Sequence, residues 1–200
     1  MDYFILTSNK AGLASVCIPE LAKTSKSRLR AVILTKPIQK KSRLLVKLKR
    51  IFKKISKIGV LGAINGFRIR KWYSYKEQNI ETLCEKYNIP FHIVEGINSK
   101  RTLDLIVSLK CDFGISVSNG YIKKSIFEAP LYGMINVHTE LLPDYPGAQS
   151  VIWPIFDMKK LTGFTIHKIN SEIDKGDILY VDSIPIKFKS NLRKTVECNL

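Results

Sequence analysis

Short apolar runs alternate along this chain with longer stretches in which apolar residues recur every three to four positions. Five runs have the length and composition of buried strands: residues 3–7, 30–35, 91–94, 112–118 and 133–137. Four stretches between them are predicted as helices: residues 12–24, 76–87, 100–110 and 123–127. Asn98 and Ser99 precede the third helix and are typical of an N-cap. This alternation predicts an α/β fold, with a mostly parallel sheet and helices on both of its faces.

The last third of the chain follows a different pattern. Residues 162–168 and 178–186 alternate between apolar and polar positions, as the strands of a hairpin or a mixed sheet do. A polar loop with the sequence SEIDKGD joins them, and a helix-like segment leads to Leu200. Because 200 residues suit one domain, we expect a single domain over residues 1–200.

Positive charge is concentrated in one segment. The chain has a formal net charge of +16, and residues 36–76 hold 14 of its 33 Lys and Arg residues and no acidic residue. Outside this segment 19 basic residues stand against 17 acidic ones, so the remainder is almost neutral. We therefore predict that residues 37–75 form a basic insert within the domain.

Apolar residues of the insert recur at helical spacing and basic residues fill its other faces, which predicts a basic amphipathic helix. The apolar set is Leu44, Leu45, Leu48, Ile51, Phe52, Ile55 and Ile58. Three roles stay open for residues 40–73. They are packing on the rest of the domain with a solvated basic face, contact with an anionic membrane surface, and contact with phosphate or RNA.

Cysteine usage and the apolar pattern bear on the compartment. Cys17, Cys84, Cys111 and Cys198 are scattered and form no CxxC pair, so neither a metal site nor a disulfide framework is indicated. The N-terminal sequence MDYFILTSNK lacks the pattern of a signal peptide. No apolar stretch approaches the ~20 residues of a membrane span. We therefore expect a cytoplasmic protein, peripheral at the inner membrane face if the insert binds lipid.

Three polar residues suggest acyl transfer to an amine. Ligands of α/β sheets collect beyond the C-terminal strand ends, where Asn136 and His138 lie. The Asn136 amide can donate to a developing oxyanion, an interaction worth on the order of 100–1,000-fold in rate. His138 can exchange a proton near neutral pH. Asp174, 36 residues further on, can orient the imidazole, stabilise its cation and position a water.

The surrounding motifs are more specific than the three residues alone. Residues 133–147 read GMINVHTELLPDYPG, and WPIF, TGFTIHKI and IDKGDIL follow in that order. This block, within about residues 112–186, resembles the folate-dependent formyltransferases. That superfamily includes methionyl-tRNA formyltransferase, glycinamide ribonucleotide formyltransferase and the sugar N-formyltransferases. The resemblance implies a Rossmann-like catalytic domain and an enzyme that uses N10-formyltetrahydrofolate as formyl donor.

The resemblance also implies roles for individual residues. It carries Asn136, His138 and Asp174 over as the catalytic residues. The folate pocket that it implies consists of Ser118, Asn119, Gly120, Tyr121, Ile122, Leu141, Leu142, Pro143 and the 172–177 loop with Gly176 and Asp177.

Some residues depart from the family pattern or carry open interpretations. Glu140 stands where a small residue is common, and Tyr145-Pro146-Gly147 stands in place of Tyr-Arg-Gly. Glu140 either contacts a substrate amine or, as we favour, is a solvated loop residue. We favour a core role for Trp153 over contact with a ligand. His167 and His92 are expected to be structural.

The acceptor amine is approached by elimination. A tRNA formyltransferase normally carries a C-terminal β-barrel domain, for which this chain has no room. A glycinamide ribonucleotide enzyme has a Gly-rich loop after the first strand, whereas residues 7–12 contain one glycine and offer Lys10 for a phosphate. We therefore expect a nucleotide-linked amino sugar, with a homodimer also considered. The alternatives are the two other acceptors and a non-catalytic binding protein of the same fold.

Overall fold

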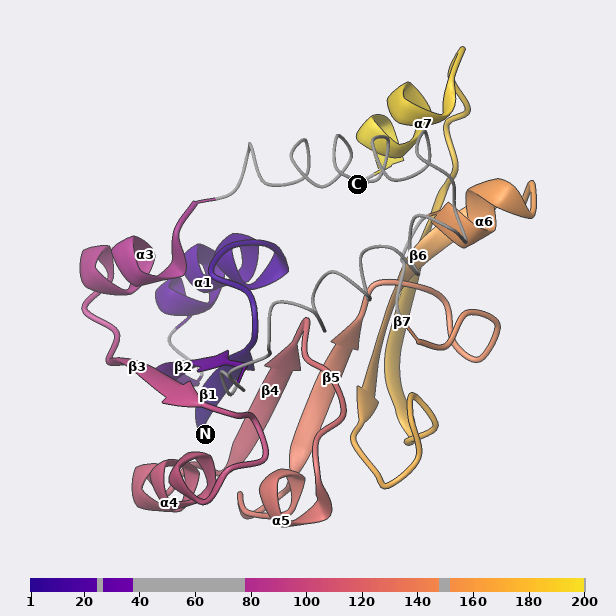
Figure 1. Cartoon of the computed structure of the whole chain (residues 1–200). Helices are drawn as coiled ribbons and strands as arrows, with labels where there is room; N and C mark the ends of the chain where they lie inside the picture. The colour runs from indigo at the N-terminus through magenta and orange to yellow at the C-terminus, as the bar shows by residue number, and fades with distance from the viewer. Residues whose placement is uncertain (25–26, 38–77, 148–151, 200) are drawn as a thin grey trace, which may run out of the picture.

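The computed structural model describes residues 1–24, 27–37, 78–147 and 152–199, and one seven-stranded sheet runs through them. The strands are β1 (Asp2–Thr7), β2 (Arg28–Lys36), β3 (Phe91–Glu95), β4 (Phe113–Val117), β5 (Met134–His138), β6 (Leu161–Lys168) and β7 (Ile178–Pro185). Their order is β3-β2-β1-β4-β5-β6-β7, as Figure 1 shows. The first five strands in this order, β3, β2, β1, β4 and β5, are parallel. β6 and β7 are antiparallel to their neighbours. The predicted Rossmann-like, mostly parallel sheet is confirmed.

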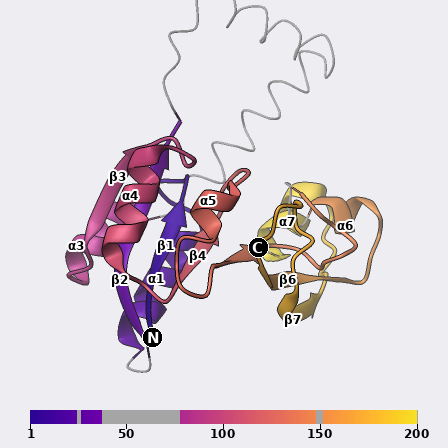
Figure 2. The same cartoon turned by 90° about the horizontal axis from the view of Figure 1, so that it is seen from below.

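Helices cover both faces of the parallel strands, as predicted (Figure 2). They are α1 (Leu13–Lys23), α3 (Ile80–Lys86), α4 (Lys100–Leu109) and α5 (Lys124–Phe127). Ile18 of α1 and Ile80 of α3 join a buried cluster with Ile5 of the central strand β1. Ile106 of α4 and Phe127 of α5 join a second cluster with residues that include Phe4 and Leu6 of the same strand. Successive side chains of β1 therefore pack into two cores, one on each face of the sheet.

Side-chain caps set the starts of two helices. Ser99 caps α4 by accepting from the Thr102 N–H at 3.2 Å, which confirms the cap expected at Asn98–Ser99. Asn79 caps α3 by accepting from the Glu81 N–H at 3.0 Å. α3 therefore begins at Ile80, later than the predicted 76, because the Asn79 backbone is extended (ψ 127°).

The last third of the chain extends the sheet and adds two short helices, α6 (Ile152–Phe156) and α7 (Leu192–Asn199). β6 and β7 form the expected antiparallel pair. Ile155, Ile186 and Val196 form a small cluster of their own. All eight residues of β7 are exposed, so this edge strand contributes little to the core.

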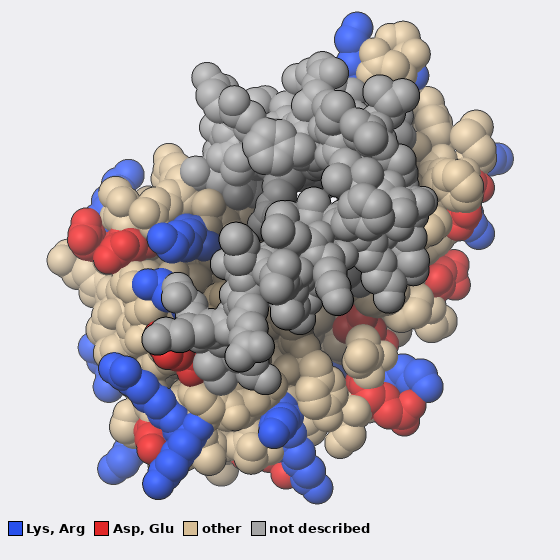
Figure 3. Space-filling view, in the orientation of Figure 1, with Lys and Arg blue, Asp and Glu red and all other residues tan. Residues whose placement is uncertain are grey.

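The predicted insert, residues 37–75, lies almost entirely outside the described residues. Basic and acidic side chains both appear over the described surface in Figure 3. All four cysteines are free thiols, and burial raises the pKa of the Cys84 thiol to about 11. Among the described residues, no helix is long and apolar enough to cross a membrane.

A substitution at Gly163 of β6 would test how closely the backbones of β6 and β7 approach each other. A methyl group there would overlap the Asp182 carbonyl oxygen of β7. Because that oxygen is backbone, Gly163→Ala should lower the free energy of unfolding by roughly 1–3 kcal/mol in a urea titration. Gly120→Ala is the control, since no atom lies within 4 Å of its added methyl group. Equal stability of the two variants would contradict the described packing.

Candidate functional site

A cavity of about 520 Å³ opens at the C-terminal ends of β4 and β5. Its wall includes Asn136, His138 and Asp174, so the three residues singled out in the sequence face one space. Five predicted folate-pocket residues also line it: Ser118, Asn119, Gly120, Tyr121 and Ile122. Glu172 and Ile173 of the predicted 172–177 loop line it as well. Residues that sequence reasoning did not select complete the wall: Ser116, Val137, Thr139, Gly147, His167, Ile169 and Asn170.

Strand register explains why the polar groups meet. Ser116 of β4 is opposite Asn136 of β5, and Asn136 is opposite His167 of β6. Residues opposite one another project from the same face of a sheet, and His138 shares that face because it lies two positions from Asn136. One polar row therefore crosses three strands.

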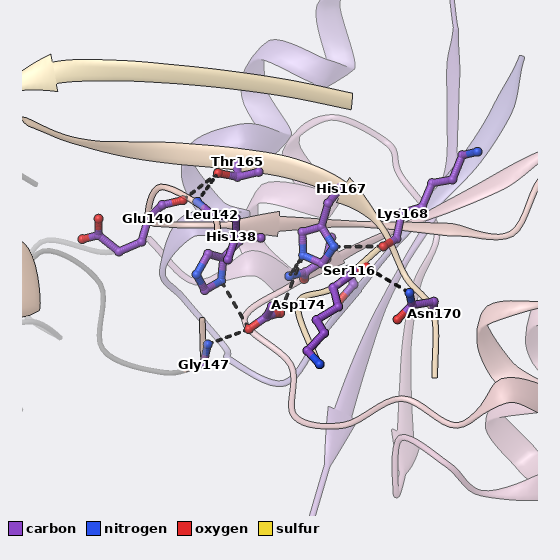
Figure 4. A network of polar contacts seen from close by, with 12 residues as sticks. Ser116, His138, Glu140, Leu142, Gly147, Thr165, His167, Lys168, Asn170 and Asp174 are labelled. Atoms are coloured by element: carbon purple, nitrogen blue, oxygen red, sulfur yellow. Dashed lines mark hydrogen bonds and ion pairs between the residues drawn. The ribbon is translucent and has the colours of Figure 1, made fainter. Parts of the chain in front are cut away.

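His138 closes strand β5 and is nearly buried. Its Nε2 lies 2.7 Å from the carbonyl oxygen of Tyr145. A carbonyl oxygen can only accept, so Nε2 carries the hydrogen of this bond. The other ring nitrogen, Nδ1, lies 3.9 Å from Oδ2 of Asp174 (Figure 4). The neutral ring thus presents its lone pair toward that carboxylate.

Asp174 is held by the backbone of another loop. The Gly147 N–H donates to its Oδ2 at 2.7 Å, and its own backbone is left-handed (φ 53°), a conformation that Asp tolerates better than most residues. Gly147 also has a positive φ of 90°, which favours glycine. The carboxylate is therefore fixed in place beside His138.

His167 lines the same cavity as Asn136, His138 and Asp174. The expectation that it is structural did not place it in the site. Its Nδ1 donates to the Lys168 carbonyl oxygen at 2.9 Å, so Nε2 is the accepting nitrogen of the neutral ring. Asn136 Nδ2 donates to that Nε2 at 3.1 Å, and Asp174 Oδ1 lies 3.6 Å away. Asn136 keeps a second N–H, because a primary amide has two.

The Asn119 side chain holds the start of the predicted pocket segment, residues 118–122, in place. Its Nδ2 donates to the Leu6 carbonyl oxygen at 2.7 Å and to Ser116 Oγ at 3.0 Å. Its Oδ1 accepts from Ser8 Oγ at 2.8 Å. The side chain therefore ties the segment to β1 and β4, while Tyr121 and Ile122 give the cavity an apolar wall.

Seven predicted site residues do not line the cavity: Lys10, Glu140, Leu141, Leu142, Pro143, Gly176 and Asp177. The Leu142 N–H donates to Thr165 Oγ1 at 3.1 Å, and the Leu142–Pro143 peptide bond is cis. The backbone of Lys10 accepts from the Ile80 N–H at 2.9 Å, and its side chain is exposed. These residues shape the surroundings of the cavity, and their roles toward a ligand stay predictions.

Two side chains differ from the expectations. The interpretation of Glu140 as a solvated loop residue is wrong, because it is 2% exposed and Thr162 Oγ1 donates to its carboxylate at 3.2 Å. The core role favoured for Trp153 is also wrong. Trp153 is 46% exposed, and its ring meets the Phe156 ring edge-on at 5.9 Å between centroids. His92 lies on β3, away from the cavity lining.

Comparison with known proteins identifies the family to which this Rossmann-like domain belongs. Residues 97–197 match the model of the formyl transferase family. The chain belongs to that family.

Relatives and solved structures agree with this assignment. A methionyl-tRNA formyltransferase from Staphylococcus epidermidis is 32% identical over 114 residues, which are 56% of this chain and 37% of that relative. Glycinamide ribonucleotide transformylase 1 from Symbiobacterium toebii shares the fold, with a TM-score of 0.65 at 12% identity over all of this chain and 80% of that one. A sugar N-formyltransferase from Shewanella sp. FDAARGOS_354 has a TM-score of 0.52 at 17% identity over 94% of this chain and 58% of that one. The chain spans about a third to two fifths of the curated relatives it matches.

Gly176 sets the position of the Asp174 loop. A methyl group at Gly176 would overlap the Lys168 carbonyl oxygen, so Gly176→Ala must move the loop away from β6. We expect the imidazole ¹⁵N resonances of both His138 and His167 to shift in NMR spectra, because Asp174 lies beside both rings. Asp177→Ala is the control, since its side chain is 80% exposed. Unchanged His138 and His167 resonances in Gly176→Ala would refute this role.

Proposed function

We propose that this chain transfers a formyl group from N10-formyltetrahydrofolate to a primary amine. The observation that carries the proposal is the convergence of Asn136, His138 and Asp174 on one cavity in a member of the formyl transferase family. An amide donor, an imidazole and a carboxylate are the groups needed to stabilise an oxyanion and move a proton. Catalysis at this site would use the three side chains without a covalent enzyme intermediate.

The cavity suits the donor in size and lining. A volume of about 520 Å³ lies within the range of ordinary small-molecule sites. Tyr121, Ile122 and Ile173 offer apolar surface for a flat ring system, and the polar row of Asn136, His138 and His167 lines the same cavity. When bound, N10-formyltetrahydrofolate supplies the activated formyl group.

Each catalytic residue has a role that its contacts allow. The second N–H of Asn136 would donate to the formyl oxygen as it gains negative charge. His138, once protonated on Nδ1, would add a second donor and be stabilised by Asp174 at 3.9 Å. Asp174, with a water, would assist loss of the proton from the attacking amine. The formyl carbon gains a bond to that amine and loses its bond to N10, which takes up a proton.

Removal of either ionisable group should abolish most of the activity. We expect His138→Ala and Asp174→Ala each to reduce the rate of formyl transfer at least ~100-fold, because His138 would stabilise the developing oxyanion and Asp174 would assist loss of the amine proton. His92→Ala is the matched control, since this histidine is on β3, away from the cavity. Single-turnover assays and folate-analogue titration would separate chemistry from binding. Full activity in both variants would exclude the proposed chemistry.

The acceptor that we favour is a nucleotide-linked amino sugar. The loop after β1 contains one glycine, Gly12, which argues against a Gly-rich phosphate loop of the glycinamide ribonucleotide type. Methionyl-tRNA is the second candidate, and the observation in its favour is that methionyl-tRNA formyltransferases are relatives at 32–36% identity. Since the chain spans only part of those relatives, its length does not separate the two acceptors.

The basic segment also bears on which acceptor the protein uses. Residues 36–76 hold 14 Lys and Arg residues and no acidic residue, and contact of residues 40–73 with RNA or an anionic membrane stays part of the proposal. The rival function, a non-catalytic binding protein of the same fold, would bind through this segment without transferring formyl groups.

A panel of amines distinguishes these acceptors. With N10-formyltetrahydrofolate as donor, we expect formylation of a nucleotide-linked amino sugar to exceed that of methionyl-tRNA and glycinamide ribonucleotide at least tenfold in kcat/KM, a difference of about 1.4 kcal/mol. Product mass identifies the formylated amine. A preference for methionyl-tRNA would establish the second candidate. Absence of both folate-analogue binding and formyl transfer would support the binding protein.

A further inference from the structure

We infer that Tyr145 is a positioning residue whose backbone carbonyl selects the tautomer of His138, and that the Tyr145–Asp157 contact holds this carbonyl in place. The inference rests on the proposed function for its catalytic consequence. Its structural part concerns only one hydrogen bond to His138 and the contacts behind it, so it can be tested without any substrate.

The tautomer follows from the partners of the two ring nitrogens. Nε2 of His138 lies 2.7 Å from the Tyr145 carbonyl oxygen, which accepts and cannot donate. The neutral ring therefore keeps its hydrogen on Nε2 and its lone pair on Nδ1, the nitrogen that faces Asp174 at 3.9 Å. In the other tautomer the lone pairs of Nε2 and the carbonyl oxygen would face each other.

Three restraints act on the Tyr145 carbonyl. The Tyr145 N–H donates to the Leu141 carbonyl oxygen at 3.1 Å and closes a turn. Pro146 disfavours a helical backbone at the residue before it, which keeps Tyr145 extended or in a turn. The phenol donates to Asp157 Oδ2 at 2.9 Å. The first two restraints are backbone, so the phenol is the part that a side-chain substitution can remove.

Asp157 is itself anchored to α6. Its N–H donates to the Trp153 carbonyl oxygen at 2.8 Å, in the turn that ends the helix. Partial burial, followed by the bond to Asp157 and nearby negative charge, raises the pKa of Tyr145 to about 12. The phenol consequently keeps its hydrogen for donation throughout the neutral range. Tyr145 does not line the cavity, so its influence on a bound ligand would pass through His138.

The other described groups near His138 have different partners or positions. Asp174 and the His167 ring, 6.4 Å away between centroids, lie on its other side. Glu140 is two residues along the chain, and its carboxylate accepts from Thr162. Among these contacts, only the Tyr145 carbonyl is paired with Nε2, which makes it the group that distinguishes one ring nitrogen from the other.

The test uses Tyr145→Phe and Asp157→Ala, which remove the contact from opposite ends. Asp157→Asn is the conservative variant, because its side-chain oxygen still accepts from the phenol. Tyr132→Phe, at a side chain 66% exposed, is the control for loss of a phenol. The primary readout is the pair of His138 imidazole ¹⁵N shifts above the pH at which the ring is protonated. The second is formyl transfer, with kcat and KM measured separately.

We expect the wild-type spectrum to show hydrogen on Nε2, and Tyr145→Phe and Asp157→Ala to show a mixture of the two tautomers. In both variants kcat should fall about 2- to 10-fold, as expected for loss of one hydrogen bond, with KM within twofold of wild type. Asp157→Asn and Tyr132→Phe should match wild type in both readouts.

Retention of the pure Nε2–H tautomer in Tyr145→Phe and Asp157→Ala would overturn the inference, even if activity fell. A wild-type ring with hydrogen on Nδ1 would overturn it as well. If the tautomers respond as expected while wild type formylates no amine, the positioning role stands and the proposed function fails. Because Asp157 is exposed, Asp157→Ala keeps the test decisive should Tyr145→Phe not fold.

Discussion

Antiparallel pairing of β6 with β5 is the constraint on which the arrangement of the site depends. β6 runs back along β5 and ends where the Ile169 N–H donates to the Met134 carbonyl oxygen at 2.8 Å. The pairing puts His167 opposite Asn136, and the loop that follows returns over the same face to bring Asp174 to His138. If β6 were shifted by one residue, its side chains would project to the other face and His167 would leave the site.

The parallel half of the sheet was predictable because its signals are local. Buried strands appear as continuous apolar runs, and the capping contact of Ser99 lies within a few residues of the helix that it starts. The predicted strands agree with β1 to β5 to within two residues at every end. The late start of α3 was also encoded locally, in Asn79 followed two residues later by Glu81, although helical periodicity alone did not reveal it.

The candidate site was only partly predictable, for a physical reason. Asn136, His138 and Asp174 stand in motifs that point to their chemistry, whereas the place of His167 depends on strand register, which alternation within TGFTIHK does not specify. Burial of Glu140 and exposure of Trp153 are likewise set by packing between distant segments. The contribution of Gly147 is a backbone N–H, which leaves no side-chain signal except the preference of its φ for glycine.

The two imidazoles of the site are held in related ways. Each donates one N–H to a backbone carbonyl oxygen, His138 to that of Tyr145 and His167 to that of Lys168. A backbone carbonyl oxygen is not protonated near neutral pH, so the nitrogen bonded to it keeps its hydrogen. Any proton that either ring gains must therefore bind the other ring nitrogen. Both of those nitrogens face the Asp174 carboxylate, at 3.9 and 3.6 Å. Positive charge that develops on either ring thus forms beside the same negative charge, which explains why one fixed carboxylate serves both histidines.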